Sequence, residues 1–169
     1  MSPIEIIQSK IFKDTPSFLP VLDQWRQNGN TIVFTNGCFD LVHRGHIDSL
    51  AKAAEWGDRL IVGLNSDVSV RLLKGENRPL VDQQSRAVLL ASMLMVDAVV
   101  MFDEETPYQM IEHILPDVLV KGSEYQIEEI AGHDIVLASG GKVIRVELTE
   151  GFSTSEIIQK IKNKFLAAQ

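Results

Sequence analysis

Thr31-Ile-Val-Phe-Thr-Asn-Gly-Cys-Phe-Asp40, running on into Leu41-Val-His43-Arg-Gly-His46, is the stretch that decides the fold of this sequence. Residues 31–35 are all β-branched or aromatic, which is typical of a buried strand, and Asn36-Gly37 interrupts that run where the chain must turn. From His46 to Trp56 the apolar residues recur at helical spacing. The stretch therefore predicts a strand, a tight loop and a helix.

The predicted loop leads from a strand end into a helix start, where unpaired backbone N–H groups and the positive end of the helix dipole attract an anion. His43 and His46 lie there, and the small Gly45 between them lets a phosphate approach the backbone. One histidine there is most often a cap or a solvated side chain, but a cap needs no second imidazole. Zinc is a poor alternative, because no Cys or Glu stands at ligand spacing. The loop predicts phosphate chemistry.

Asn36-Gly-Cys-Phe-Asp40 followed by His43-Arg-Gly-His46 resembles the signature of the HxGH nucleotidyltransferases, which move a nucleoside monophosphate from an NTP onto a phosphate or phosphosugar. Within that superfamily the sequence is most similar to the adenylyltransferase domain of ADP-heptose synthases, from about Thr31 to the C-terminal helix. The resemblance implies ATP and D-glycero-D-manno-heptose 1-phosphate as substrates. ADP-heptose, a precursor of lipopolysaccharide or a surface glycan, and pyrophosphate would be the products.

The resemblance also implies roles for individual residues. The expected catalytic residues are His43, His46, Lys74 and Arg86. The expected nucleotide contacts are Asn36, Gly37, Cys38 and Phe39 in the first loop, and Gly151, Ser153, Thr154 and Ser155 before the last helix. The expected substrate contacts are Asp40, Asn65, Lys121 and Gly122.

The residue types agree with several of these roles. Residues 71–79 hold three cations and a glycine beside the predicted nucleotide loop, which suits a triphosphate and a sugar phosphate, although solvated surface charges are the alternative for Lys74 and Arg86. Asn65 ends a strand, where it meets ligands or helps to cap the next helix. Lys121 follows another strand, and Gly122 permits close backbone approach.

The last segment predicts a well-capped helix. Ser153 and Glu156 have the spacing of a capping box, and a hydroxyl-rich helix start also presents donors to a phosphate. Four apolar residues predict the buried face of this helix: Ile157, Ile158, Ile161 and Phe165. Related cytidylyltransferases carry an arginine where this chain has Leu148.

Five apolar runs alternate with helical patterns, which predicts an α/β fold with a Rossmann-like, doubly wound, five-stranded parallel sheet. The runs are residues 31–35, 60–64, 98–102, 117–120 and 142–146. Residues 1–169 are expected to form one domain, because neither a linker nor an internal repeat appears. Residues 1–30 form an N-terminal helical extension in this prediction, with an amphipathic helix over residues 17–27.

The composition narrows the partners and the compartment. A formal charge of −7 argues against nucleic acid and an anionic membrane, and no apolar run is long enough to span a bilayer. A single cysteine and the absence of a signal-peptide pattern predict a cytoplasmic protein. We expect Mg²⁺ to arrive with ATP rather than at a metal site of the chain, since the three carboxylates at 103–105 are explained by the following helix start. The resemblance implies a homodimer and a separate heptose kinase.

Two other functions stay open from the sequence. The first is cytidylyl transfer to an acceptor such as glycerol 3-phosphate, and the second is a nucleotide-binding domain without turnover. A dinucleotide-dependent oxidoreductase is disfavoured, because the first strand-to-helix loop lacks the G-x-G-x-x-G pattern.

Overall fold

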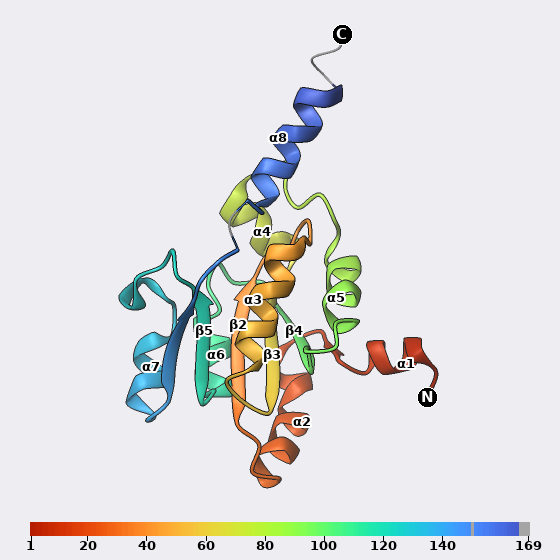
Figure 1. The fold of residues 1–169 in the computed structure, drawn as a ribbon. Helices are drawn as coiled ribbons and strands as arrows, with labels where there is room; N and C mark the ends of the chain where they lie inside the picture. Colours follow the sequence, from red (N-terminus) through yellow and green to blue (C-terminus); the bar gives the residue numbers. More distant parts are fainter. Residues whose placement is uncertain (150, 166–169) are drawn as a thin grey trace.

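Six parallel strands form the sheet at the centre of the molecule, in the order β1-β4-β3-β2-β5-β6 (Figure 1). The strands are β1 (Ile11–Phe12), β2 (Ile32–Gly37), β3 (Arg59–Asn65), β4 (Ala98–Phe102), β5 (Val118–Gly122) and β6 (Lys142–Val146). The computed structural model describes residues 1–149 and 151–165. It confirms the Rossmann-like α/β fold.

The predicted number of five strands is wrong by one. The additional strand, β1, lies within the predicted N-terminal helical extension and pairs with Val99 and Val100 of β4. A strand of two residues is too short to produce a recognisable alternation of apolar and polar residues. It is flanked by α1 (Pro3–Gln8) and α2 (Thr15–Gln27), and α2 begins two residues before the predicted helix because Asp14 caps it.

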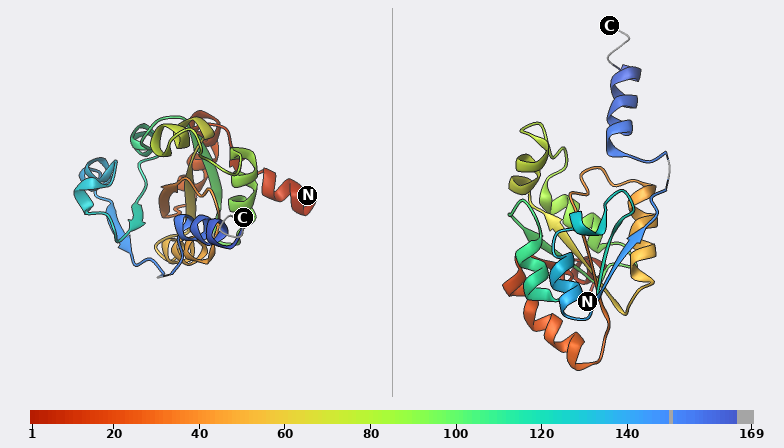
Figure 2. Two further views of the ribbon diagram at one scale, coloured as in Figure 1. Left: turned by 90° about the horizontal axis from the view of Figure 1, so that it is seen from above. Right: turned by 90° about the vertical axis from the view of Figure 1, so that its left-hand side faces the viewer.

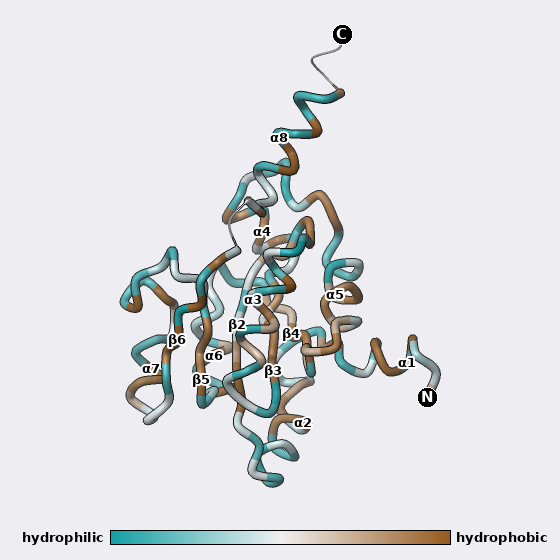
Figure 3. The backbone as a smooth tube through the Cα atoms, viewed as in Figure 1, coloured by the Kyte–Doolittle hydropathy of each residue, from teal (hydrophilic) through white to brown (hydrophobic). Residues whose placement is uncertain are grey.

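Two helical layers cover the two faces of the sheet (Figure 2). On one face, α3 (Arg44–Ala54) and α5 (Gln83–Ala91) pack on a core that includes Val33, Val62 and Val99. On the other face, α2, α6 (Tyr108–Ile114) and α7 (His133–Ala138) pack on Phe34, Ile61 and Val100. Successive strand residues point to opposite faces, so strands buried on both sides are continuous apolar runs. Figure 3 shows these apolar segments in the central strands.

The last helix, α8 (Thr154–Phe165), differs from its prediction. The expected buried face of Ile157, Ile158, Ile161 and Phe165 is wrong, because none of these residues is buried. Ile161 is 51% exposed and Phe165 is 69% exposed. The helix projects away from the sheet (Figure 2), so most of its apolar side faces solvent in the described part of the chain. The predicted cap is present, since Ser153 Oγ accepts a hydrogen bond from the Glu156 N–H at 3.0 Å.

The strand order reverses at β2, which lies between β3 and β5. In open parallel sheets such a switch point leaves a crevice at the carboxyl ends of the strands, where ligands bind. The loops that follow β2 and β5 meet there, together with α4 (Asp67–Lys74), which follows β3. Among the described residues, no helix is both long and apolar enough to cross a membrane.

Candidate active site

The two histidines of the first loop stack on each other at the start of α3. His43 is the N-cap residue of that helix, and His46 is its third residue. Their ring centroids are 3.9 Å apart and their planes differ by 29°. The spacing therefore brings both imidazoles together, as the sequence predicts.

His46 is held as a neutral donor. Its Nδ1 accepts a hydrogen bond from the His43 backbone N–H at 3.3 Å, in the place that Glu or Gln takes in a capping box. With Nδ1 as acceptor, the proton of the neutral ring lies on Nε2. Burial, with smaller contributions from the charges of His43 and Lys74, lowers the pKa of His46 to about 4. At neutral pH this imidazole is uncharged.

The C-terminal loop docks on the histidine loop. The Phe152 ring lies 6.4 Å from the His43 ring and nearly parallel to it, and Thr154 Oγ1 donates to the Leu41 carbonyl at 3.5 Å. Gly45 is buried beneath this contact. A Cβ atom at this position would lie 3.1 Å from both His43 and Phe152. The glycine thus makes room for an aromatic ring, whereas the sequence suggests that it makes room for a phosphate.

Two adjoining cavities open at the carboxyl ends of β2 and β5, with volumes of about 260 and 450 Å³. His46, Asp40 and Thr154 line the smaller one, and Asn65 and Thr106 line the larger. Both cavities share a wall made of Asn36, Gly37, Cys38, Lys74, Lys121 and Tyr125. Their combined size is in the range of small-molecule sites.

A cavity of about 580 Å³ lies at the opposite end of the sheet. Arg26, Trp56 and Asp117 are among its lining residues, and Asp117 is already engaged, since it accepts a hydrogen bond from the Ile32 N–H at 2.7 Å. Neither His43 nor His46 lines this cavity. We therefore place the functional site at the carboxyl ends, where the chemistry-bearing side chains converge.

Lysines supply the positive charge of this site. Lys74, the last residue of α4, lines both cavities. Lys121 donates to the backbone and side-chain oxygens of Asn36 at 2.8 and 2.9 Å, and lies 5.5 Å from the centre of the Tyr125 ring. Burial lowers the pKa of Lys121 to about 8, although Glu124 and Cys38 oppose that shift. Lys121 is therefore a charged donor on the shared wall at neutral pH.

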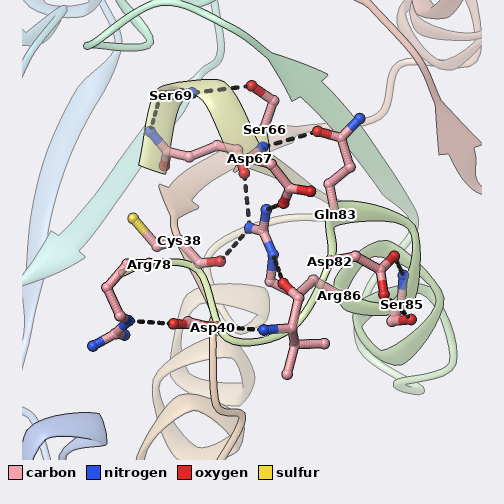
Figure 4. A network of polar contacts seen from close by, with 12 residues as sticks. Cys38, Asp40, Ser66, Asp67, Ser69, Arg78, Asp82, Gln83, Ser85 and Arg86 are labelled. Atoms are coloured by element: carbon pink, nitrogen blue, oxygen red, sulfur yellow. Dashed lines mark hydrogen bonds and ion pairs between the residues drawn. The ribbon is translucent and has the colours of Figure 1, made fainter. Parts of the chain in front are cut away.

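Arg86 lies elsewhere than the resemblance implies. Its side chain is fully buried and lines neither cavity. Its guanidinium donates to the carbonyls of Val81 at 2.9 Å, Cys38 at 2.6 Å and Asn65 at 2.7 Å, and pairs with Asp67 at 2.7 Å (Figure 4). In this structure Arg86 therefore does not face a phosphate site, contrary to the expectation, because its donors bond to other groups of the protein.

Asp40 is likewise engaged by protein groups. Its carboxylate accepts from the backbone N–H groups of Leu80 at 2.7 Å and Val81 at 2.9 Å and pairs with Arg78. Burial alone would raise the pKa of Asp40, but the bonds from Val81, Arg78 and Leu80 outweigh burial and hold the pKa below its ordinary value. Asp40 is 3% exposed and borders the smaller cavity without a free carboxylate oxygen. Its expected contact with the substrate stays a prediction.

Asn65 donates its side-chain amide to Ser69 Oγ at 2.9 Å and lines the larger cavity. Gly122 leaves space for the Glu124 carboxylate, which a Cβ atom at this glycine would strike. Glu124 and Tyr125 line the smaller cavity, and Phe152 covers His43, yet the sequence singles out none of the three. All three lie within three positions of an expected site residue in the sequence, and this is the signal that could have found them.

Magnesium has no ready-made protein site among the described residues, where no group of three His, Cys, Asp or Glu side chains could hold a metal ion. Mg²⁺ usually binds through substrate phosphates with one or two carboxylates. The donor set here fits an ion that arrives already bound to a triphosphate. The carboxylates that line the cavities are Asp40 and Glu124 in the smaller one and Glu105 and Glu129 in the larger one.

The chain resembles known proteins over most of its length. It is 52% identical over 142 residues to the bifunctional protein HldE of Azorhizobium caulinodans, covering 84% of this chain and 30% of that protein. It is 53% identical over 146 residues to the bifunctional protein HldE of Wolinella succinogenes, covering 86% of this chain and 30% of that protein. The chain thus spans less than a third of the length of these relatives.

A solved structure and a family model agree with these relatives. The lipopolysaccharide core biosynthesis protein of Thermoplasma volcanium superposes with a TM-score of 0.59 at 26% identity, over 72% of this chain and 98% of that chain. The family model described as cytidylyltransferase-like matches residues 34–160, from β2 into α8. That range contains both loops of the site. The chain belongs to the cytidylyltransferase-like family of HxGH nucleotidyltransferases.

Proposed function

We propose that this protein transfers AMP from ATP to the phosphate of D-glycero-D-manno-heptose 1-phosphate, forming ADP-heptose and pyrophosphate. The observation that carries the proposal is the stacked pair of His43 and His46 beside Lys74, at a helix start that opens on the smaller cavity. Neutral imidazole donors and lysine ammonium groups suit a triphosphate whose charge is redistributed during transfer.

The reaction needs positioning more than proton transfer. An oxygen of the acceptor phosphate is already anionic, so it attacks the α-phosphorus of ATP without a strong base. A bond forms between that oxygen and the α-phosphorus, and the bond from the α-phosphorus to the oxygen that bridges to the β-phosphorus breaks. The electron pair leaves with pyrophosphate. Lys74 and His46 line the smaller cavity, and in this proposal the lysine and the Nε2–H stabilise the charge that develops.

The relatives and the cavity support the proposed acceptor and the proposed base. About half of the aligned residues are identical to those of the bifunctional proteins HldE, and this chain aligns with one part of them. Leu148 lines the smaller cavity, and related cytidylyltransferases carry an arginine at this position. An apolar side chain there favours ATP over CTP in our proposal. Mg²⁺ would enter with ATP, and a cytoplasmic location would supply both substrates.

Cytidylyl transfer is the second candidate, favoured by the description of the matching family model. The acceptor would then be a small phosphate such as glycerol 3-phosphate. A nucleotide-binding domain without turnover would need neither both imidazoles nor the two lysines of the shared wall.

The test is pyrophosphate release by the purified protein with Mg²⁺, in a matrix of ATP, CTP or GTP against heptose 1-phosphate or glycerol 3-phosphate. We expect release only with ATP and heptose 1-phosphate, together with a product of the mass of ADP-heptose. Reactions without an acceptor measure background hydrolysis. Release confined to CTP would move the protein to cytidylyl transfer, and nucleotide binding without release in every combination would favour the binding domain.

A further inference from the structure

Phe39 has a backbone conformation that residues with a Cβ atom rarely adopt. Its φ is +46°, in the left-handed region, and its side chain is only 9% exposed. A residue remains in that region only where the surrounding structure fixes the chain on both sides. The neighbours of Phe39 therefore indicate what holds it there.

Both neighbours of Phe39 are bonded to α5 or to the segment that leads into it. On one side, the Cys38 carbonyl accepts a hydrogen bond from the Arg86 guanidinium at 2.6 Å. On the other side, the Asp40 carboxylate accepts from the N–H groups of Leu80 and Val81. Figure 4 shows the bonds of Arg86 to the Cys38 carbonyl and of Asp40 to Arg78.

The Phe39 ring in turn contacts His46. The two ring centroids are 5.3 Å apart, and the other close neighbour of the His46 ring is His43. Gly37 lies directly beneath the Phe39 ring, since a Cβ atom there would come within 3.0 Å of it. The position of the ring therefore depends on the backbone conformation of Phe39 and on the absence of a side chain at Gly37.

We propose that Arg86 and Asp40 are positioning residues, which hold Phe39 in its left-handed conformation so that the Phe39 ring fixes the direction of the His46 imidazole. The role of His46 in turnover rests on the proposed function, but the geometric part of this proposal does not. Neither Arg86 nor Asp40 needs to touch a substrate.

An arginine is required for this role because of the acceptors around it. The planar guanidinium spreads its donors over carbonyls from three separate segments, at Cys38, Asn65 and Val81, and over the carboxylate of Asp67. A lysine carries three donors on one atom, so it cannot reach all four acceptors. Arg86→Lys therefore keeps the charge while it releases part of the loop.

The test compares Arg86→Lys and Asp40→Asn with a matched control at the other end of β3. Arg59 pairs with Asp97 at 3.0 Å there, far from the histidines, and Arg59→Lys is the control. We expect the first two variants to lower kcat for pyrophosphate release at least tenfold while KM for ATP changes less than threefold. Arg59→Lys should leave kcat unchanged even where it lowers Tm.

A second measurement does not depend on turnover. NMR titration of the ligand-free protein should show the pKa of His46 rising from about 4 toward its ordinary value in Arg86→Lys and Asp40→Asn, because the ring loses its fixed burial. The Arg59→Lys control should leave that titration unchanged. An unaltered His46 titration in both site variants would overturn the proposal, whatever happens to kcat.

Phe39→Leu separates the ring from the network. This variant keeps an apolar side chain and leaves Arg86 and Asp40 in place. It therefore tests the contact between the Phe39 ring and His46 even where the other variants fold poorly. We expect a loss of kcat similar to that of Arg86→Lys; full kcat with an unchanged His46 titration would refute the ring contact. If the wild-type protein releases no pyrophosphate, the proposed function fails, and the titrations alone decide the positioning role.

Discussion

The two ends of the sheet satisfy their backbone groups with side chains of opposite charge. At the amino ends of the strands, aspartates accept hydrogen bonds from backbone N–H groups: Asp58 from Thr31, Asp117 from Ile32 and Asp97 from Leu60. At the carboxyl ends, cations donate to backbone carbonyls: Arg86 to Cys38 and Asn65, and Lys121 to Asn36. These bonds follow from the direction of the parallel strands.

This difference explains how an acidic protein offers a site to anions. The chain has a net charge of −7, yet Lys74 and Lys121 line the cavities at the carboxyl ends of the strands. Strands that run in one direction present N–H groups at one end and carbonyls at the other, so aspartate is useful at the first and lysine or arginine at the second. In the proposed function, phosphate groups are attracted locally to the second end.

The largest expected effect of a single substitution is at the carboxyl end. His46→Ala removes one donor from the transfer step, and the loss of such a donor lowers kcat on the order of a hundredfold. Steady-state pyrophosphate release measures this effect. If His46→Ala keeps the kcat of the wild-type protein, His46 at the carboxyl end has no role in turnover.

Stability measurements on the same variant provide the control. The native pKa of His46 is about 4, below the value of 6.5 in the unfolded chain, so between these values the unfolded chain binds the additional proton. His46 therefore makes the wild-type protein less stable as pH falls from about 6.5 to 4. His46→Ala should lose less stability over that interval in chemical denaturation, which would show that the variant is folded.

At the amino end we expect the reverse, a loss of stability without a loss of turnover. Asp97→Ala removes the acceptor of the Leu60 N–H and the partner of Arg59. A buried N–H group without a partner costs about 1–3 kcal/mol of unfolding free energy. Urea denaturation measures this loss, with kcat expected to stay within a factor of two. A fall in kcat as large as that of His46→Ala would mean that the two ends are coupled.

A smaller effect should distinguish Lys121 from an ordinary surface lysine. Its pKa of about 8 means that the ammonium group loses its proton as pH rises through 8, so affinity for an anionic substrate should weaken between pH 7 and 9. Lys121→Met should weaken binding about tenfold, the value of one charge-assisted hydrogen bond, and should remove this pH dependence. Lys121→Arg stays charged and should keep its affinity at pH 9. Calorimetric titration with ATP is the measurement.

The smallest effect should lie outside both ends of the sheet, in α8. Ile161 is 51% exposed, and substitutions at such positions usually change stability by less than about 0.5 kcal/mol. Ile161→Ser should therefore leave the urea midpoint close to that of the wild-type protein. A large decrease that depends on protein concentration would instead show that a second copy covers α8.

Local patterns were sufficient to predict most of the fold. The runs in β2, β3 and β4 are apolar because these strands are buried on both faces. Burial of this kind can be predicted directly from a continuous apolar run. The convergence of His43 and His46 could be predicted as well, since three residues in one helical turn determine it. The burial of Ile161 and Phe165 could not, because an amphipathic pattern shows that an apolar side exists and not what covers it.

The buried position of Arg86 could not be predicted from the sequence, for a different reason. In the sequence it is a charged residue in the first turns of a helix, which usually indicates a solvated side chain or a ligand contact. Its partners in space, Cys38 and Asn65, are 48 and 21 residues away, and they bind through backbone carbonyls that have no signature in the sequence. The left-handed conformation of Phe39 could not be predicted either, since the residue at this position is not a glycine.

The docking of Phe152 has a consequence for the competition between nucleophiles. Its segment is tied along α3, since Thr149 bonds to Asp48 at 2.8 Å and Lys52 to the Glu147 carbonyl at 2.7 Å. If the proposed function is right, an aromatic ring held over His43 would restrict how water approaches the phosphorus atom of ATP. In the proposed transfer, water competes with the sugar phosphate for ATP. The ratio of sugar product to hydrolysed ATP would then depend on residues 147–149 and 151–155 as much as on the histidine loop.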